Sequence, residues 1–210
     1  MTLLACSLLV LAKEPVAGRV KTRLTPPLTS AQGAAVAAAC LADTLAAVAA
    51  TPVARRVLVL DGAVTFPVPE GFAVLPQRGG GLDERLTAAF DDAADGLPLL
   101  LVGMDTPQVT PALLTSAVEA LLRTDAVLGL ADDGGWWALG LRAPHPRAFL
   151  DVPMSTERTG REQAARLAAL GLAVTDLPVL RDVDTAPDLD LVLRDVAPTS
   201  ALAALMAVRA

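Results

Sequence analysis

The sequence has one histidine, two cysteines and no tyrosine among its 210 residues. The single histidine, His145, lies between two prolines, in a segment that we expect to be a surface loop. A Ser-His-Asp or Cys-His nucleophile system therefore has no base to use. The type of catalysis that the sequence still allows is one assisted by a metal ion or by fixed cations.

The two cysteines, Cys6 and Cys40, lie in apolar patterns without CxxC or Cys/His spacing. This arrangement gives no support for a disulfide framework or a zinc site, and it predicts a cytoplasmic location. The first apolar run, residues 3–12, lacks the charged start of a signal peptide and is shorter than the roughly 20 residues that cross a bilayer. We expect it to be a buried strand, with no membrane partner.

The protein is acidic, with a formal net charge of -6, and its arginines outside the first 24 residues are scattered. The aromatic residues are four phenylalanines and two tryptophans. A protein of this composition offers neither a long basic face nor stacking platforms, so nucleic acid is not an expected partner.

Apolar runs alternate along the chain with helical patterns. The runs cover residues 3–12, 56–61, 72–76, 97–105, 125–131, 136–141 and 172–180, and the helical patterns cover 30–50, 82–94, 111–123, 158–170 and about 200–208. This order predicts a single α/β domain over residues 1–210, with a mostly parallel sheet and ligands bound beyond the carboxyl ends of the strands. The alanine-rich helices could pack within the monomer or across a homodimer.

The stretch AKEPVAGRVKTRL, residues 12–24, follows the first run and holds both lysines of the chain, Lys13 and Lys21, with Arg19 and Arg23. Each close pair of these cations repels by about 1 kcal/mol even in water, and Glu14 is the only carboxylate nearby in the sequence. A bound phosphate would offset the repulsion, and Gly18 would let the backbone approach it. A solvated basic turn is the alternative.

Aspartates follow three of the later strands. Asp105 lies in GMDTP, Asp133 in ADDGGWW, and Asp182 and Asp184 in LRDVDTAPD. Carboxylates beside substrate phosphates suit Mg²⁺, and two close carboxylates favour a shared ion. Each segment also has a structural alternative, which is a turn cap for Asp105, a hairpin turn for Asp133 and a helix start for the last two.

Taken together, these segments resemble the bacterial GT-A-like nucleotide-diphospho-sugar transferase family, and more distantly 2-phospholactate guanylyltransferase and the molybdenum-cofactor guanylyltransferases. The similarity runs nearly end to end. It depends on AKEPVAGRVKTRL, on LPQRGGGLDERLTAAF (75–90), on GMDTP, on DGGWWALGL (133–141), on STERTGREQ (155–163) and on DVDTAPDL (182–189).

The resemblance implies a Rossmann-like GT-A fold of three layers and a role for each of these segments. The implied phosphate-binding or nucleotide-binding residues are Lys13, Gly18, Arg19, Lys21, Arg23, Gly80 and Arg85; the implied ligands of Mg²⁺ or Mn²⁺ are Asp105, Asp182 and Asp184. Lys21, Arg23, Asp105 and Asp133 would be catalytic. Trp136 and Met154 stand where the family usually has tyrosine and tryptophan, on the expected acceptor side.

Three functions are compatible with this pattern. The favoured one is metal-dependent nucleotidylyl transfer from a nucleoside triphosphate to a small phosphorylated or carboxylate acceptor, which needs no general base because the acceptor is already ionised. The second is glycosyl transfer from a nucleotide-sugar, with Asp133 as the base. The third is a nucleotide-binding protein without catalytic activity.

Overall fold

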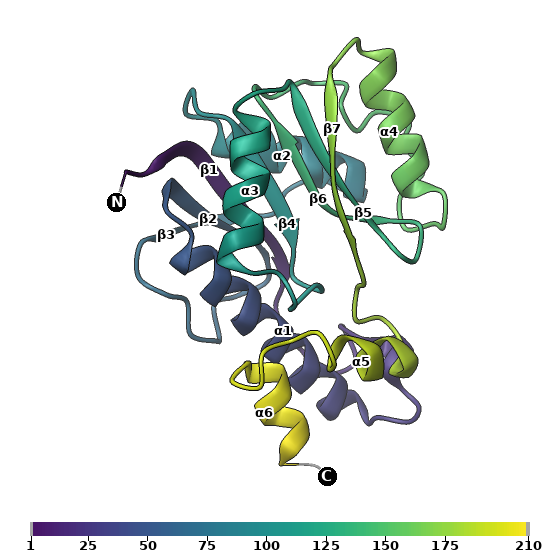
Figure 1. The fold of residues 1–210 in the computed structure, drawn as a ribbon. Coiled ribbons are helices and arrows are strands. Elements are labelled where there is room, and N and C mark those ends of the chain that lie inside the picture. Colours follow the sequence, from purple (N-terminus) through teal and green to yellow (C-terminus); the bar gives the residue numbers. More distant parts are fainter. Residues whose placement is uncertain (1, 209–210) are drawn as a thin grey trace.

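The computed structural model describes residues 2–208, and within that range the chain forms a seven-stranded sheet flanked by helices (Figure 1). The strands are β1 (Leu4–Lys13), β2 (Val53–Asp61), β3 (Phe72–Pro76), β4 (Leu99–Gly103), β5 (Ala126–Ala131), β6 (Trp136–Leu141) and β7 (Val174–Leu180). The helices are η1 (Thr22–Leu24), α1 (Ser30–Ala50), α2 (Leu82–Ala93), α3 (Pro111–Leu121), α4 (Thr159–Ala169), α5 (Ala186–Val192) and α6 (Ala201–Ala207).

The strand order is β3-β2-β1-β4-β6-β5-β7, and every neighbouring pair is parallel except the two that involve β6. The predicted α/β fold with a mostly parallel sheet is therefore confirmed. β6 runs antiparallel because the four residues between β5 and β6 form a hairpin turn, as the Asp-Gly sequence there predicts.

The sheet has helices on both faces, which explains why its central strands are continuous apolar runs. Leu8 and Val10 of β1 pack into the cluster that contains buried residues of α1 and α3, whereas Leu9 between them packs into the cluster that contains residues of α2 and α4. The structure thus has the three layers expected from the sequence.

Helix α1 is long and apolar enough to cross a membrane by length and composition, but most of it is buried inside the protein. One face packs on the sheet, and another face packs against α5 and α6, which lie beside it in Figure 1. Its start follows the sequence, since Thr29 accepts from the Gln32 backbone N–H while the Gln32 side chain accepts from the Thr29 backbone N–H. α1 is a core helix of the fold.

Trp137 of β6 contacts both β5 and β7 at one side of the sheet. Its side chain is 1% exposed, and its Nε1 donates to the Pro178 carbonyl of β7 at 2.9 Å. The indole passes over Gly129 of β5, where an added Cβ would lie 2.5 Å from Nε1. A glycine is needed at this position because a larger residue would displace the buried ring.

We expect Gly129→Ala to lower the free energy of unfolding by about 1–3 kcal/mol, because the methyl group forces a packed indole from its site. Urea denaturation of the purified protein measures the change. Val179→Ala is the matched control, since Val179 is 55% exposed on the neighbouring edge strand and should change stability by less than about 0.5 kcal/mol. Equal stability of Gly129→Ala and the wild type would contradict the packing.

Candidate functional site

A cavity of about 750 Å³ lies beyond the carboxyl ends of the parallel strands. It is lined by most of the residues proposed from the sequence: Lys13, Arg19, Lys21, Arg23, Arg85, Asp105, Asp133, Asp182 and Asp184. Gly18 and Gly80 are not among its lining residues, and the backbone N–H of Gly80 donates instead to Glu84 Oε2 at 2.7 Å. The basic loop and the acidic segments therefore meet in one cavity.

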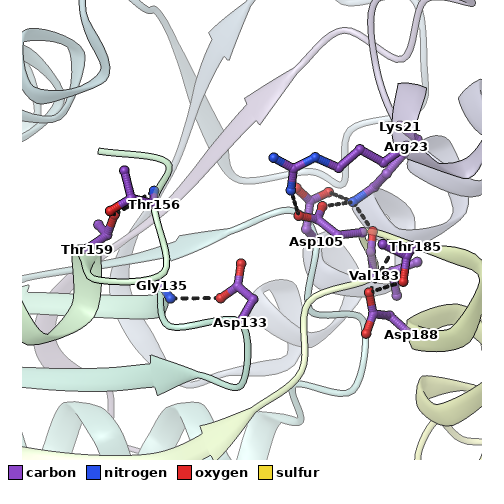
Figure 2. A network of polar contacts seen from close by, with 11 residues as sticks. Lys21, Arg23, Asp105, Asp133, Gly135, Thr156, Thr159, Val183, Thr185 and Asp188 are labelled. Carbon is purple, nitrogen blue, oxygen red and sulfur yellow. Dashed lines mark hydrogen bonds and ion pairs between the residues drawn. The ribbon is translucent and has the colours of Figure 1, made fainter. Parts of the chain in front are cut away.

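Lys21 lies at the centre of this arrangement. Its side chain is 4% exposed, and its Nζ lies 2.6 Å from Asp105 Oδ1 and 3.6 Å from Asp184 Oδ1, with a further hydrogen bond to the Val183 carbonyl (Figure 2). Burial alone would lower the pKa of Lys21, but the charges of Asp105 and Asp184 outweigh burial and raise it. The ammonium group is thus a permanent cation between two carboxylates.

The backbone of Lys21 is left-handed, with φ of 50°, which turns the chain into η1 and aims the side chain inward. Glu14 forms no ion pair with the loop within residues 2–208 and accepts hydrogen bonds from the Ala63 N–H and the Thr65 hydroxyl, although its charge still interacts with that of Arg19. The carboxylates that neutralise Lys21 come from distant segments instead.

The other cations of the loop remain accessible. Arg23 has a side chain that is 69% exposed and that lies 3.3 Å from Asp184 Oδ2. Lys13 and Arg19 are exposed, and neither side chain forms an ion pair within residues 2–208. These three cations can meet an anion in the cavity, whereas Arg85 is already held by Asp61 at 3.2 Å.

Asp182 is the carboxylate most affected by its surroundings. Burial, together with the negative charges of Asp105 and Asp133, raises the pKa of Asp182 to about 8. Its Oδ1 atom is buried and has no hydrogen-bond partner in the described chain. An unpartnered carboxylate oxygen beside other carboxylates is the donor type that a hard divalent cation prefers.

The donor chemistry therefore fits Mg²⁺ or Mn²⁺, although the side chains are not gathered around an ion-sized space. Within residues 2–208 no group of three or more His, Cys, Asp or Glu side chains is close enough to hold a metal. The ammonium of Lys21 lies against Asp105 and Asp184 instead. Metal binding by Asp105, Asp182 and Asp184 stays a prediction.

Two residues that the sequence did not single out hold the acidic segment in place. Gln108 Nε2 donates to the Arg181 carbonyl at 2.7 Å, close to the bond from the Val183 N–H to the Asp105 carbonyl. The Arg181 guanidinium contacts Asp132 at 2.6 Å and Asp188 at 3.1 Å. The charges in LRDVDTAPD and in ADDGGWW are visible in the sequence, but the pairing of Arg181 with Asp132 is not.

The opposite side of the cavity is formed by the β5–β6 turn and the segment before α4. Asp133 Oδ1 accepts from the Gly135 N–H at 2.8 Å, and Figure 2 shows Asp133 between the Lys21 cluster and Thr156. The Thr159 hydroxyl donates to the Pro153 carbonyl at 2.7 Å. The segment therefore forms the hairpin turn that its sequence predicts, and Asp133 and Gly135 also line the cavity.

Aromatic and polar groups complete this side. Trp136 stacks on Phe149 with ring centroids 6.4 Å apart, and Met154, Ser155, Thr156 and Glu157 also line the cavity. The Gly160 N–H donates to the Gly134 carbonyl at 2.8 Å, which fastens the turn to the start of α4. This wall contributes carboxylates, hydroxyls and an indole but no cation among its lining residues, in contrast to the side formed by the basic loop.

Comparison with known proteins gives a family and a curated relative. The family model described as "Uncharacterized protein conserved in bacteria (DUF2064)" matches residues 38–156. The phosphoenolpyruvate guanylyltransferase of Salinispora arenicola (strain CNS-205) is 34% identical over 180 residues, which cover 82% of this chain and 81% of that protein.

Solved structures have the same fold. A protein from Desulfovibrio desulfuricans G20, named provisionally as a nucleotide-diphospho-sugar transferase, superimposes with a TM-score of 0.85 at 26% identity, over 98% of this chain and 94% of that chain. Rv0371c from Mycobacterium tuberculosis, solved in complex with manganese, gives a TM-score of 0.55 at 23% identity, over 92% and 100% of the two chains. The GT-A-like resemblance expected from the sequence is confirmed.

We expect Lys21→Met to lower the free energy of unfolding by about 1–3 kcal/mol, because it leaves Asp105 and Asp184 without the buried cation between them. Arg23→Met is the matched control, since the exposed Arg23 contacts the same Asp184 and its loss should change stability by less than about 0.5 kcal/mol. Chemical denaturation at pH 7 compares the two variants. Equal losses would show that Lys21 does not hold the carboxylates together.

The stability of the metal-free protein should depend on pH through Asp182. The pKa of Asp182 is about 8 in the folded state, against an ordinary value of 3.8. Between these values the folded protein keeps a proton that the unfolded chain has lost, so this group makes the free energy of unfolding fall as pH rises. Asp182→Asn has no such proton, and its stability relative to the wild type should increase from pH 5 to pH 8.

Urea denaturation at both pH values, in the presence of a chelator, measures this difference. Asp176→Asn, which removes an exposed charge from β7, controls for the general effect of losing a carboxylate. A stability difference between Asp182→Asn and the wild type that stays constant over this interval would contradict the burial of Asp182.

Proposed function

The chain belongs to the DUF2064 family of bacterial proteins and is a nucleotide-dependent transferase, and we propose that it transfers a nucleotidyl group from a nucleoside triphosphate to a small acceptor. The acceptor carries a phosphate or a carboxylate that attacks as an anion. The proposal is supported chiefly by one observation, that exposed cations and a cluster of aspartates line the same cavity.

The cations are suited to a polyphosphate. Lys13, Arg19 and Arg23 have accessible side chains on the wall formed by the basic loop, and a triphosphate brings enough negative charge to engage all three. Lys21 is already balanced by carboxylates. Its role in this proposal is to keep Asp105 and Asp184 beside the bound phosphates.

In the proposed reaction an acceptor oxygen attacks the α-phosphorus. The new P–O bond forms as the bond from the α-phosphorus to the bridging oxygen breaks, and pyrophosphate leaves with the electron pair of that bond. Arg19 and Arg23 stabilise the charge that develops on the leaving group. A divalent cation, held by Asp105, Asp182 and Asp184, would supply further neutralisation of the phosphate charge.

Glycosyl transfer is the second candidate, and the wall opposite the basic loop favours it. Asp133 lines the cavity, and within residues 2–208 its carboxylate accepts one hydrogen bond, to Oδ1 from the Gly135 N–H, so Oδ2 is available to accept a proton from an acceptor hydroxyl. The Desulfovibrio desulfuricans protein is named for nucleotide-diphospho-sugars, and its similarity covers nearly all of both chains. A nucleotide donor in either reaction fits the predicted cytoplasmic location.

Product analysis separates the two reactions. The protein is incubated with Mg²⁺, each of the four nucleoside triphosphates and a set of small phosphorylated and carboxylate acceptors that includes phosphoenolpyruvate. Pyrophosphate released only when an acceptor is present supports nucleotidylyl transfer. Release of a nucleoside diphosphate from a nucleotide-sugar, without pyrophosphate from triphosphates, would replace it with glycosyl transfer.

We expect Arg19→Ala to weaken triphosphate binding by about 10- to 100-fold, because a charge-assisted contact with the β- or γ-phosphate is lost. Binding of the corresponding monophosphate should change by less than about threefold. Isothermal titration calorimetry measures both affinities. Arg78→Ala is the control, since Arg78 is paired with Asp92 and does not line the cavity. An equal loss for both nucleotides would remove Arg19 from the triphosphate site.

A further inference from the structure

The ammonium group of Lys21 lies between two of the carboxylates that are predicted to hold a metal ion. Its Nζ is 2.6 Å from Asp105 Oδ1 and 3.6 Å from Asp184 Oδ1, and it donates to the Val183 carbonyl (Figure 2). Arg23 lies 3.3 Å from the second oxygen of Asp184, Oδ2. Both carboxylates therefore already have a cation as a partner.

The backbone that carries this ammonium group is held by close packing. Gly33 of α1 lies against it, since a Cβ added to Gly33 would be 3.3 Å from the Lys21 carbonyl oxygen. The same oxygen accepts from the Leu24 N–H at 3.0 Å, and Leu24 is buried in one cluster with Val183. Apolar packing as well as charge thus fixes Lys21 beside the acidic segment.

The charges of this cluster are balanced without an added ion. Lys21 and Arg23 bring two positive charges to the two negative charges of Asp105 and Asp184. In the described part of the chain no three acidic side chains are gathered around an ion-sized space, and Asp182 Oδ1 is the buried carboxylate oxygen without a partner. A free divalent cation would have to share its carboxylates with an ammonium group, and like charges at such distances repel even in water.

We propose that Lys21 keeps divalent cations out of the nucleotide-free protein, so that the metal enters only together with the triphosphate. Mg²⁺ usually takes one or two carboxylates plus substrate phosphates as ligands, and a triphosphate supplies the anionic oxygens that this cluster lacks. With these oxygens present, the metal and the ammonium group no longer compete for the same two carboxylates. Joint entry rests on the proposed use of a nucleoside triphosphate, whereas the exclusion of free metal does not.

Binding of Mn²⁺ in the absence of nucleotide tests the exclusion, and electron paramagnetic resonance measures it as the loss of the free-ion signal. Lys21→Met and Lys21→Gln both remove the charge, and the glutamine keeps a donor for the Val183 carbonyl. Each variant should bind Mn²⁺ at least about tenfold more tightly than the wild type. Lys21→Gln keeps the test decisive where Lys21→Met does not fold.

Arg23→Met is the matched control, because it removes the same charge from the same carboxylate, that of Asp184. The Arg23 side chain is exposed, whereas that of Lys21 is buried, so solvent already screens the charge of Arg23. Its loss should raise the affinity for Mn²⁺ by less than about threefold. Equal gains for the variants of Lys21 and Arg23, or no gain for either variant of Lys21, would overturn the role of Lys21.

Chemical modification of the wild type gives a measurement that needs no variant. The chain has two lysines, so acetylation by an N-hydroxysuccinimide ester, quantified by mass spectrometry, reports on the buried Lys21 with the exposed Lys13 as the internal reference. Excess Mn²⁺ without nucleotide should leave the ratio of the two reactions unchanged, because the ammonium group keeps its place. A rise in the relative reactivity of Lys21 would mean that free metal displaces it, against the inference.

A triphosphate analogue separates this inference from the proposed function. An analogue with a methylene group in place of the α,β-bridging oxygen prevents transfer, and the wild type should bind it more tightly with Mn²⁺ than with a chelator. Equal affinity under the two conditions would overturn the joint entry of metal and nucleotide. Failure of the analogue to bind under either condition would overturn the proposed function, and the exclusion of free metal would still be decided by the variants of Lys21.

Discussion

The ion pairs of one buried lysine hold this site together. Lys21 brings the loop after β1 against Asp105 at the end of β4 and against Asp184 beyond β7, and it also binds the Val183 carbonyl. These segments are far apart in the sequence, and without the ammonium group the two partly exposed carboxylates would lose the cation that lies between them. The positions of the neighbouring groups follow from this contact.

The cations of the loop after β1 therefore have two different roles. Lys21 is neutralised by the protein itself, whereas Lys13, Arg19 and Arg23, which also contacts Asp184, have exposed side chains that can meet an external anion. Along the edge of the sheet, the lining of the cavity changes from these cations through Asp105 to Asp133 and Trp136.

Much of this arrangement is predictable from the sequence, and the reasons differ between parts. The strands and helices follow from long apolar runs and clear caps such as Thr29 and Thr110, because local patterns determine them. The rule that ligands bind beyond the strand ends brings the basic loop and the aspartates into one cavity. The pairing of Lys21 with Asp105 is a contact across 84 positions, and no local pattern specifies which of four cations is buried. Gln108 and Arg181 contact a backbone carbonyl or carboxylates from other segments, and no local pattern specifies such partners.

The reversed direction of β6 has a consequence for how such a protein can change. Because β6 is antiparallel to β4 and β5, its first residue, Trp136, reaches the same edge as the last residues of its neighbours. One wall of the cavity is thereby built from a hairpin and the loop after it, while the other is built from parallel strands whose loops bind one another through Lys21. New side chains or a longer turn in the hairpin could alter which molecule receives the transferred group. Such changes would leave the loops joined by Lys21, and therefore the binding of the nucleotide donor, unaltered.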